Sequence, residues 1–216
     1  MTPQRHDWVF LHPGAQPAFA TADVHSRAWI ERWLANEGPL VVTRQTAPKG
    51  RVALGVVLPA SYGATRVACT VGLAEVARHR GPVTVDEAAS ALAPAEASAL
   101  RRFADALAGH VARIGIYGST AWQFLTGETY RHARSDVDVV CDIGSKSGFS
   151  ACLAAFADAA RYFPTMIDGE LRFAGGRAVA WRELHNACNG GPSVVLVKSE
   201  REIALFSLGR MLADLR

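Results

Sequence analysis

From Arg113 onward, short apolar runs alternate with amphipathic segments, and this alternation restricts the fold more than any other feature of the sequence. The runs 114–117 and 137–143 have the length and β-branched content of strands. Segments 119–125 and 149–163 have helical spacing. Because strands that alternate with helices are typical of α/β or α+β folds, we expect a mixed sheet with flanking helices, in an α+β fold.

The rest of this region continues the pattern. Strand-like runs follow at 165–173, 177–181 and 194–197, and Arg182 is expected to open a helix. Apolar spacing predicts a closing helix over 200–215.

The first third of the chain is typical of a smaller α/β unit. We expect a helix over 23–37 that ends at Gly38-Pro39. Strands are expected at 8–11, 40–43, 52–58 and 66–71. A boundary near Gly81-Pro82 precedes a capping-box pattern at Thr84 and Glu87. The sequence therefore predicts two domains, residues 1–81 and 82–216.

Composition excludes several classes of protein. The 216 residues are 50% hydrophobic and 20% charged, as in ordinary globular proteins, which argues against long disorder. No run of 18 apolar residues occurs, so no membrane partner is expected. The net charge of +3 comes without a Lys/Arg block, which argues against nucleic-acid binding. Four cysteines without a CxxC pair argue against zinc and favour reduced thiols in the cytoplasm.

Two aspartates at the start of a strand carry the first chemical signal. Asp136 and Asp138 flank Val137, so their side chains share one strand face, about 6–7 Å apart at the backbone. Two carboxylates about 5 Å apart repel by roughly 3 kcal/mol at an effective dielectric constant of 20. A divalent cation such as Mg²⁺ would offset this repulsion. The alternative is a solvated pair neutralised by Arg131 or Arg134.

A second signal precedes the aspartates. Gly118-Ser119 joins a strand to a helix, and free N–H groups at a helix N-terminus bind phosphate. Gly118 permits close approach, and the Ser119 hydroxyl adds a donor. The alternative is that Ser119 is an ordinary helix N-cap. Phosphate cradle and metal ligands together predict metal-assisted transfer of a nucleotidyl group.

These motifs resemble a known family. Gly118-Ser119 followed by Asp136-x-Asp138 is similar to the signature of the DNA-polymerase-β-like nucleotidyltransferases. The longer segments IYGSTAWQFLTGETYRHARSDVDVV, IDGELRFAGGRAVAWRELH and VLVKS resemble the malonate decarboxylase holo-acyl-carrier-protein synthases, also called phosphoribosyl-dephospho-CoA transferases. RHDWVFLHPGA and VVTRQTAPKGRVALGVVLP, near the N-terminus, are also similar to that family, so the resemblance covers nearly the whole chain.

The resemblance implies a specific reaction. Enzymes of this family move the phosphoribosyl-dephospho-CoA prosthetic group from 2′-(5″-triphosphoribosyl)-3′-dephospho-CoA to a serine of the apo acyl-carrier subunit of malonate decarboxylase. Pyrophosphate is released. The implied cofactor is Mg²⁺ or Mn²⁺, held by Asp136 and Asp138, which can stabilise both the attacking and the leaving oxygen.

Such a site usually needs a third carboxylate on a neighbouring strand. Asp168 and Glu170 share one face of the run 165–173; we favour Asp168, whereas Glu170 has an alternative as a cross-strand partner of Arg172 or Arg177. Candidate catalytic residues are thus Asp136, Asp138, Asp168 and Glu170, and candidate substrate-binding residues are Gly118, Ser119, Arg134, Arg182 and Lys198.

The N-terminal domain carries no catalytic constellation, so we expect it to recognise the donor or the carrier, with Arg44 and Arg66 as candidate phosphate contacts. Two other functions are compatible with the motifs. One is an ATP-using nucleotidyltransferase that modifies a small molecule or another protein. The other is a catalytically silent module that binds a carrier protein, against which the intact motifs argue.

Overall fold

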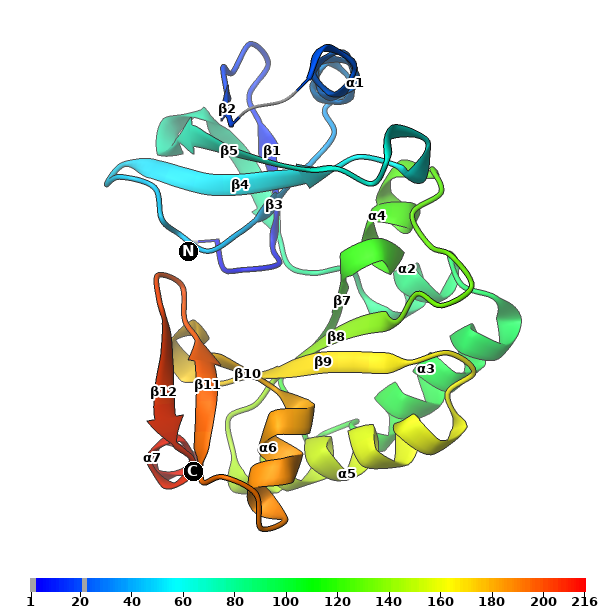
Figure 1. Cartoon of the computed structure of the whole chain (residues 1–216), viewed down its shortest axis with the longest axis vertical. Helices are drawn as coiled ribbons and strands as arrows, with labels where there is room; N and C mark the ends of the chain where they lie inside the picture. Colours follow the sequence, from blue (N-terminus) through cyan, green and yellow to red (C-terminus); the bar gives the residue numbers. More distant parts are fainter. Residues whose placement is uncertain (1–2, 21–22) are drawn as a thin grey trace. The chain divides into compact units, whose positions relative to one another are not determined.

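A computed structural model describes residues 3–20 and 23–216 and divides into two compact units (Figure 1). One unit comprises Met1–Pro82 together with Leu125–Tyr130, a segment from the middle of the chain. The other comprises Val83–Phe124 and Arg131–Arg216. Helices and mixed or antiparallel sheets occur in one chain, which confirms the expected α+β class. Among the described residues, no helix combines the length and apolar character needed to cross a membrane.

The first unit is built on a six-stranded sheet in the order β2-β5-β4-β3-β1-β6, in which every described pair of strands is antiparallel. Its strands are β1 (Trp8–Leu11), β2 (Ala18–Phe19), β3 (Leu40–Val42), β4 (Arg51–Val57), β5 (Arg66–Gly72) and β6 (Val76–Arg80). Short 3₁₀ turns occur at Ala60–Tyr62 and Leu73–Glu75. Helix α1 (Val24–Ala35) begins at Asp23, whose carboxylate accepts hydrogen bonds from the backbone N–H groups of His25 and Ser26.

Hydrogen bonds tie the segment Leu125–Tyr130 to strand β4 and to the 3₁₀ turn Ala60–Tyr62 of the same unit. The Tyr130 hydroxyl donates to the carbonyl of Val57 at 2.8 Å, and the N–H of Ala60 donates to the carbonyl of Thr129 at 3.0 Å. Burial raises the pKa of Tyr130, so the hydroxyl keeps the proton it donates.

The second unit contains a six-stranded sheet in the order β12-β11-β10-β9-β8-β7. Its strands are β7 (Arg113–Tyr117), β8 (Val137–Asp142), β9 (Ile167–Arg172), β10 (Ala178–Ala180), β11 (Val194–Lys198) and β12 (Ile203–Ser207). Only β8 and β9, among the described pairs, run parallel. Its helices are α2 (Val85–Ala89), α3 (Pro94–Ala106), α4 (Gly118–Thr126), α5 (Lys146–Tyr162), α6 (Trp181–Cys188) and α7 (Leu208–Ala213), with a 3₁₀ turn at Ala174–Gly176.

Helices α3, α5 and α6 cover one face of this second sheet (Figure 1). Aromatic contacts join them: the Phe156 ring lies 4.8 Å from that of Phe103 and is stacked on Trp181 at 5.3 Å. A Cβ on Gly169 of β9 would lie 2.8 Å from the Phe156 ring, so glycine lets α5 approach the sheet. The opposite face of the sheet is therefore the one available for polar side chains.

The prediction of one closing helix over 200–215 is wrong. Ile203–Ser207 is strand β12, paired along its length with β11, and only Leu208–Ala213 is helical. Between β11 and β12 the N–H of Ser199 donates to the carbonyl of Glu202 at 2.9 Å and closes a tight turn. The apolar spacing of these residues is compatible with a helix or a strand, and the hydrogen bonds to β11 make the segment a strand. The capping box of Thr84 and Glu87, in contrast, is confirmed at the start of α2.

Candidate active site

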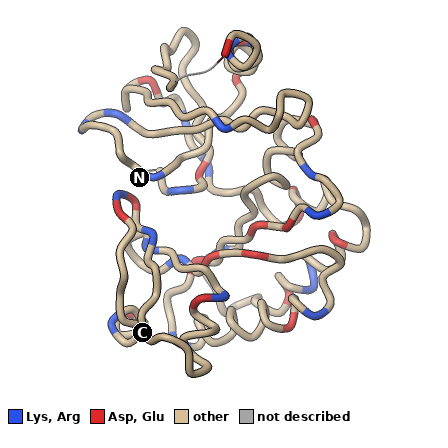
Figure 2. Tube along the Cα trace, in the orientation of Figure 1, with Lys and Arg blue, Asp and Glu red and all other residues tan. Residues whose placement is uncertain are grey.

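Carboxylates gather where β8 and β9 begin. In the parallel register, Asp138 of β8 lies directly opposite Asp168 of β9. Asp136 comes two positions before Asp138, immediately ahead of β8, and strand alternation gives it the same face. Figure 2 shows acidic residues along these two strands. Since like charges directly opposite one another destabilise a sheet, this arrangement calls for a compensating cation.

In the described part of the chain, no three acidic, histidine or cysteine side chains converge closely enough to hold a metal ion by themselves. That is the usual situation for Mg²⁺, which is commonly bound by one or two carboxylates together with water and substrate phosphates. The acidic pair Asp136 and Asp138 therefore fits a cation whose remaining ligands arrive with a triphosphate.

Asp168 provides a more specific indication. Its Oδ1 atom is buried and has no hydrogen-bond partner, while the nearest cationic group, Nε of Arg182, lies 3.7 Å away. A buried oxygen without a hydrogen bond is costly unless it has another role. Asp168 therefore lies opposite Asp138 with one buried oxygen that no hydrogen bond occupies, and this fits a divalent cation held mainly by Asp136 and Asp138.

Gly118, at the strand–helix junction, lies beside the Asp138 side chain. It follows β7 directly, has a φ of +65°, and an added Cβ would lie 1.9 Å from Oδ2 of Asp138. Only glycine meets both requirements. Ser119, half-buried, is the second residue of α4, so the alternative that it precedes the helix as an N-cap is not supported. The predicted phosphate cradle and Asp138 are thus immediate neighbours.

Glu170 differs from Asp168 although both lie on the same face of β9. Glu170 is only 4% exposed, and its Oε1 accepts a hydrogen bond from Nζ of Lys198 at 2.8 Å within an ion pair. The structure thus pairs a residue predicted to be catalytic with one predicted to bind substrate. Of the two arginines expected as its partners, Arg172 forms an ion pair with Asp142, and Arg177 with Asp214. Glu170 therefore neutralises a lysine, whereas Asp168 keeps an oxygen available.

The basic residues divide into two groups. Arg182 lies beside Asp168, with its guanidinium 4.5 Å above the Trp181 ring, and Lys198 lies beside Glu170. Arg134 is exposed, and its backbone N–H donates to Nδ1 of His132 at 3.2 Å. Arg44 and Arg66 are exposed residues of the first unit.

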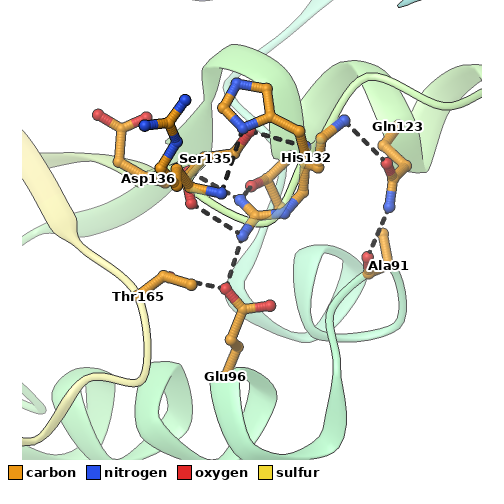
Figure 3. A network of polar contacts seen from close by, with 10 residues as sticks. Ala91, Glu96, Gln123, His132, Ser135, Asp136 and Thr165 are labelled. Atoms are coloured by element: carbon orange, nitrogen blue, oxygen red, sulfur yellow. Dashed lines mark hydrogen bonds and ion pairs between the residues drawn. The ribbon is translucent and has the colours of Figure 1, made fainter.

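Arg131 does not neutralise the aspartate side chains as the alternative interpretation of the sequence expects; it contacts Glu96 and backbone carbonyls instead. Its guanidinium forms an ion pair with Glu96 at 2.6 Å and donates to the backbone carbonyl of Asp136 at 2.7 Å (Figure 3). Figure 3 shows the Asp136 side chain pointing away from Glu96. Sequence reasoning missed Glu96 because an acidic residue in the first turn of a helix is ordinary.

Comparison with known proteins identifies the family of the chain. Residues 73–208 match the family described as the phosphoribosyl-dephospho-CoA transferase MdcG C-terminal domain, and residues 4–82 match the corresponding N-terminal domain. A phosphoribosyl-dephospho-CoA transferase of Bradyrhizobium diazoefficiens is 37% identical over 94% of this chain and 90% of its own length. A protein of the same name from Xanthomonas axonopodis pv. citri is 35% identical, over 94% and 93%.

A further relative of that name, from Pseudomonas fluorescens, is 29% identical over 95% of this chain and 94% of its own length. No solved structure matches the chain. The resemblance stated from the sequence is confirmed, and with it an enzyme of the nucleotidyltransferase type. Both halves of the chain match the same family, and its relatives are covered almost end to end. The chain therefore belongs to the phosphoribosyl-dephospho-CoA transferase family.

Proposed function

We propose that this chain transfers the phosphoribosyl-dephospho-CoA group from 2′-(5″-triphosphoribosyl)-3′-dephospho-CoA to a serine of the apo acyl-carrier subunit of malonate decarboxylase. The observation that carries the proposal, beside family membership, is the opposition of Asp138 and Asp168 next to Gly118. Carboxylates for a cation and a backbone cradle for phosphate are what transfer from a triphosphate requires.

In the proposed reaction, one bond to phosphorus forms, another breaks, and a carboxylate of the chain takes up the proton that is released. The serine oxygen of the carrier forms a bond to the α-phosphorus, and the bond from that phosphorus to pyrophosphate breaks. Asp136 and Asp138 would hold Mg²⁺ or Mn²⁺, which supplies neutralisation of the charge that builds on the phosphates. Oδ1 of Asp168, which is buried without a hydrogen bond, would accept the serine proton.

The remaining residues bind the donor. N–H groups at the start of α4 and the hydroxyl of Ser119 would contact phosphate oxygens. Arg134, Arg182 and Lys198 would neutralise the triphosphate. Residues 1–81 would recognise the donor or the carrier, with Arg44 and Arg66 as contacts, and residues 82–216 would form the catalytic domain.

Mass spectrometry of the apo carrier protein tests this function. The carrier is incubated with the full-length enzyme and Mg²⁺, and with either the complete donor or ATP. We expect the mass of the phosphoribosyl-dephospho-CoA group to be added at least about 100-fold faster than AMP, on the order of 3 kcal/mol in the transition state. Remote parts of the donor supply this difference, because their binding positions the α-phosphorus.

Two outcomes would contradict the proposal. Addition of AMP at a similar rate would favour an ATP-using nucleotidyltransferase. Stable binding of the carrier without any added mass from either donor would favour a silent binding module. The Asp138→Asn variant provides the inactive control.

A further inference from the structure

One buried carboxylate connects the two segments that deliver the candidate metal ligands. Oε1 of Glu96, in the first turn of α3, accepts from Nη2 of Arg131 at 2.6 Å and from Oγ1 of Thr165 at 2.7 Å (Figure 3). Arg131 belongs to the segment that leads into β8 through Asp136, and Thr165 to the segment that leads into β9 and Asp168. Glu96 thus bridges the two backbones just before their carboxylates.

Arg131 extends the bridge. Its Nη1 atom donates to the backbone carbonyl of Asp136 at 2.7 Å and to Oγ1 of Thr120 at 2.6 Å, and its Nη2 atom also reaches the carbonyl of Ser135 at 3.3 Å. Thr120 is part of α4, the helix that begins at Gly118. One guanidinium therefore joins the phosphate-cradle helix to the strand that carries the aspartates. The planar fork of arginine fixes directions that a lysine ammonium would leave free.

The pair is buried, with side-chain exposures of 9% for Arg131 and 11% for Glu96. Buried ion pairs contribute little to stability compared with apolar residues of similar volume, but they specify geometry when their hydrogen bonds are complete. Here the contacts go to backbone carbonyls and hydroxyls around the site, and Arg131 holds the carbonyl of Asp136. The Asp136 carboxylate itself points away from Glu96 (Figure 3).

We propose that Glu96 and Arg131 are positioning residues that set the spacing of Asp136 and Asp168, and thereby the affinity of the site for a divalent cation. Neither side chain contacts the cation or the donor in this account. The proposal rests on the metal-assisted function proposed above. Partners that orient metal ligands commonly change metal affinity or activity by about 10–100-fold when they are removed.

Mn²⁺ binding to the full chain together with inorganic triphosphate, measured by electron paramagnetic resonance of the bound ion, tests the proposal without any turnover, because the remaining ligands of the cation come from a triphosphate. Glu96→Gln should raise the Kd for Mn²⁺ by about 10-fold or more. Arg131→Lys, which keeps the charge and loses the fork, should also weaken binding. The control is Asp158→Asn, which makes the same carboxylate-to-amide change in an exposed ion pair. Asp158 of α5 lies 3.2 Å from Arg102 of α3, and the Kd of this variant should equal that of the wild type.

Thr165 provides a milder test, in case Glu96→Gln fails to fold. Thr165→Val removes one hydrogen bond at nearly constant volume and should raise the Kd several-fold, whereas Thr165→Ser should restore it. An unchanged Kd in Thr165→Val and in any folded Glu96 variant would overturn the positioning role. If the wild type itself bound no Mn²⁺ and transferred the group in EDTA, the positioning role and the metal-assisted function would both fail.

Discussion

The two ends of the β8–β9 ladder place acidic residues in opposite settings. At one end Asp142 lies opposite Arg172, with Nε to Oδ1 at 2.5 Å, and also pairs with Nε of Arg113 at 2.8 Å. At the other end Asp138 lies opposite Asp168, a like charge. In this one pair of strands, the carboxylate of Asp142 lies between two arginines at the end of the ladder, whereas two carboxylates lie opposite each other at its beginning. In the proposed function, the first end is structural and the second is the site, which would function at a cost in stability.

The largest effect should come from the acidic end. Asp138→Asn should reduce transfer at least about 100-fold, roughly 3 kcal/mol in the transition state, because a cation ligand is lost. Tm should hold or rise, because the repulsion from Asp168 is relieved. Rates of carrier modification measure the loss of transfer, and thermal melting curves measure Tm. Asp136→Asn should show the same two effects. Activity above a few per cent in either variant would remove the metal assignment.

The next comparison separates the two carboxylates of β9. Asp168→Asn should lower transfer about 100-fold with little change in Tm, because Oδ1 of Asp168 has no hydrogen bond to lose and its half-exposed 3.7 Å ion pair with Arg182 contributes little. Glu170→Gln should have a smaller effect on the rate and should lower Tm, because the buried pair with Lys198 is weakened. Single-turnover rates at a temperature where both variants are folded decide the order. A reversed order would make Glu170 the third carboxylate.

The smallest effect on transfer should come from the arginine-rich end. Asp142→Asn should leave the rate per folded molecule within about twofold, since no step of the proposed reaction uses it. It should lower the free energy of unfolding by about 2 kcal/mol, below the usual cost of breaking a buried pair, because the Asp142 side chain is 24% exposed. Denaturant titration measures the loss. A rate loss like that of Asp138→Asn would erase the distinction between the two ends.

Local sequence sufficed where neighbouring residues decide the structure. The strands beside Gly118 and Asp138 and the capping box at Thr84 follow from patterns within a few residues. Contacts between distant segments were not predictable: Thr165 lies 69 positions from Glu96, and Tyr130 lies 73 positions from Val57. Strand β12 was misjudged for the same reason, because its pairing with β11 outweighs an apolar spacing that also suits a helix.

Within the candidate site, the sequence predicted which types of residue would occur, and the structure showed which partners each of them contacts. Asp168 and Glu170 occupy equivalent positions in the strand pattern, and their partners separate them: Nζ of Lys198 lies 2.8 Å from Glu170, whereas Nε of Arg182 lies 3.7 Å from Asp168. The role of Arg131 depended on which acidic group it would meet, and that group, Glu96, comes from another helix. Side-chain partners across elements therefore required coordinates.

Metal dependence tests the central claim most directly. Enzyme and substrates are freed of metal with EDTA, and carrier modification is measured in a single turnover before and after Mg²⁺ or Mn²⁺ is restored. We predict no transfer with EDTA and full transfer with either ion, because both accept oxygen ligands such as those at the start of β8 and β9. Transfer that continues at the same rate in EDTA would show that the acidic end of the ladder is not a cation site.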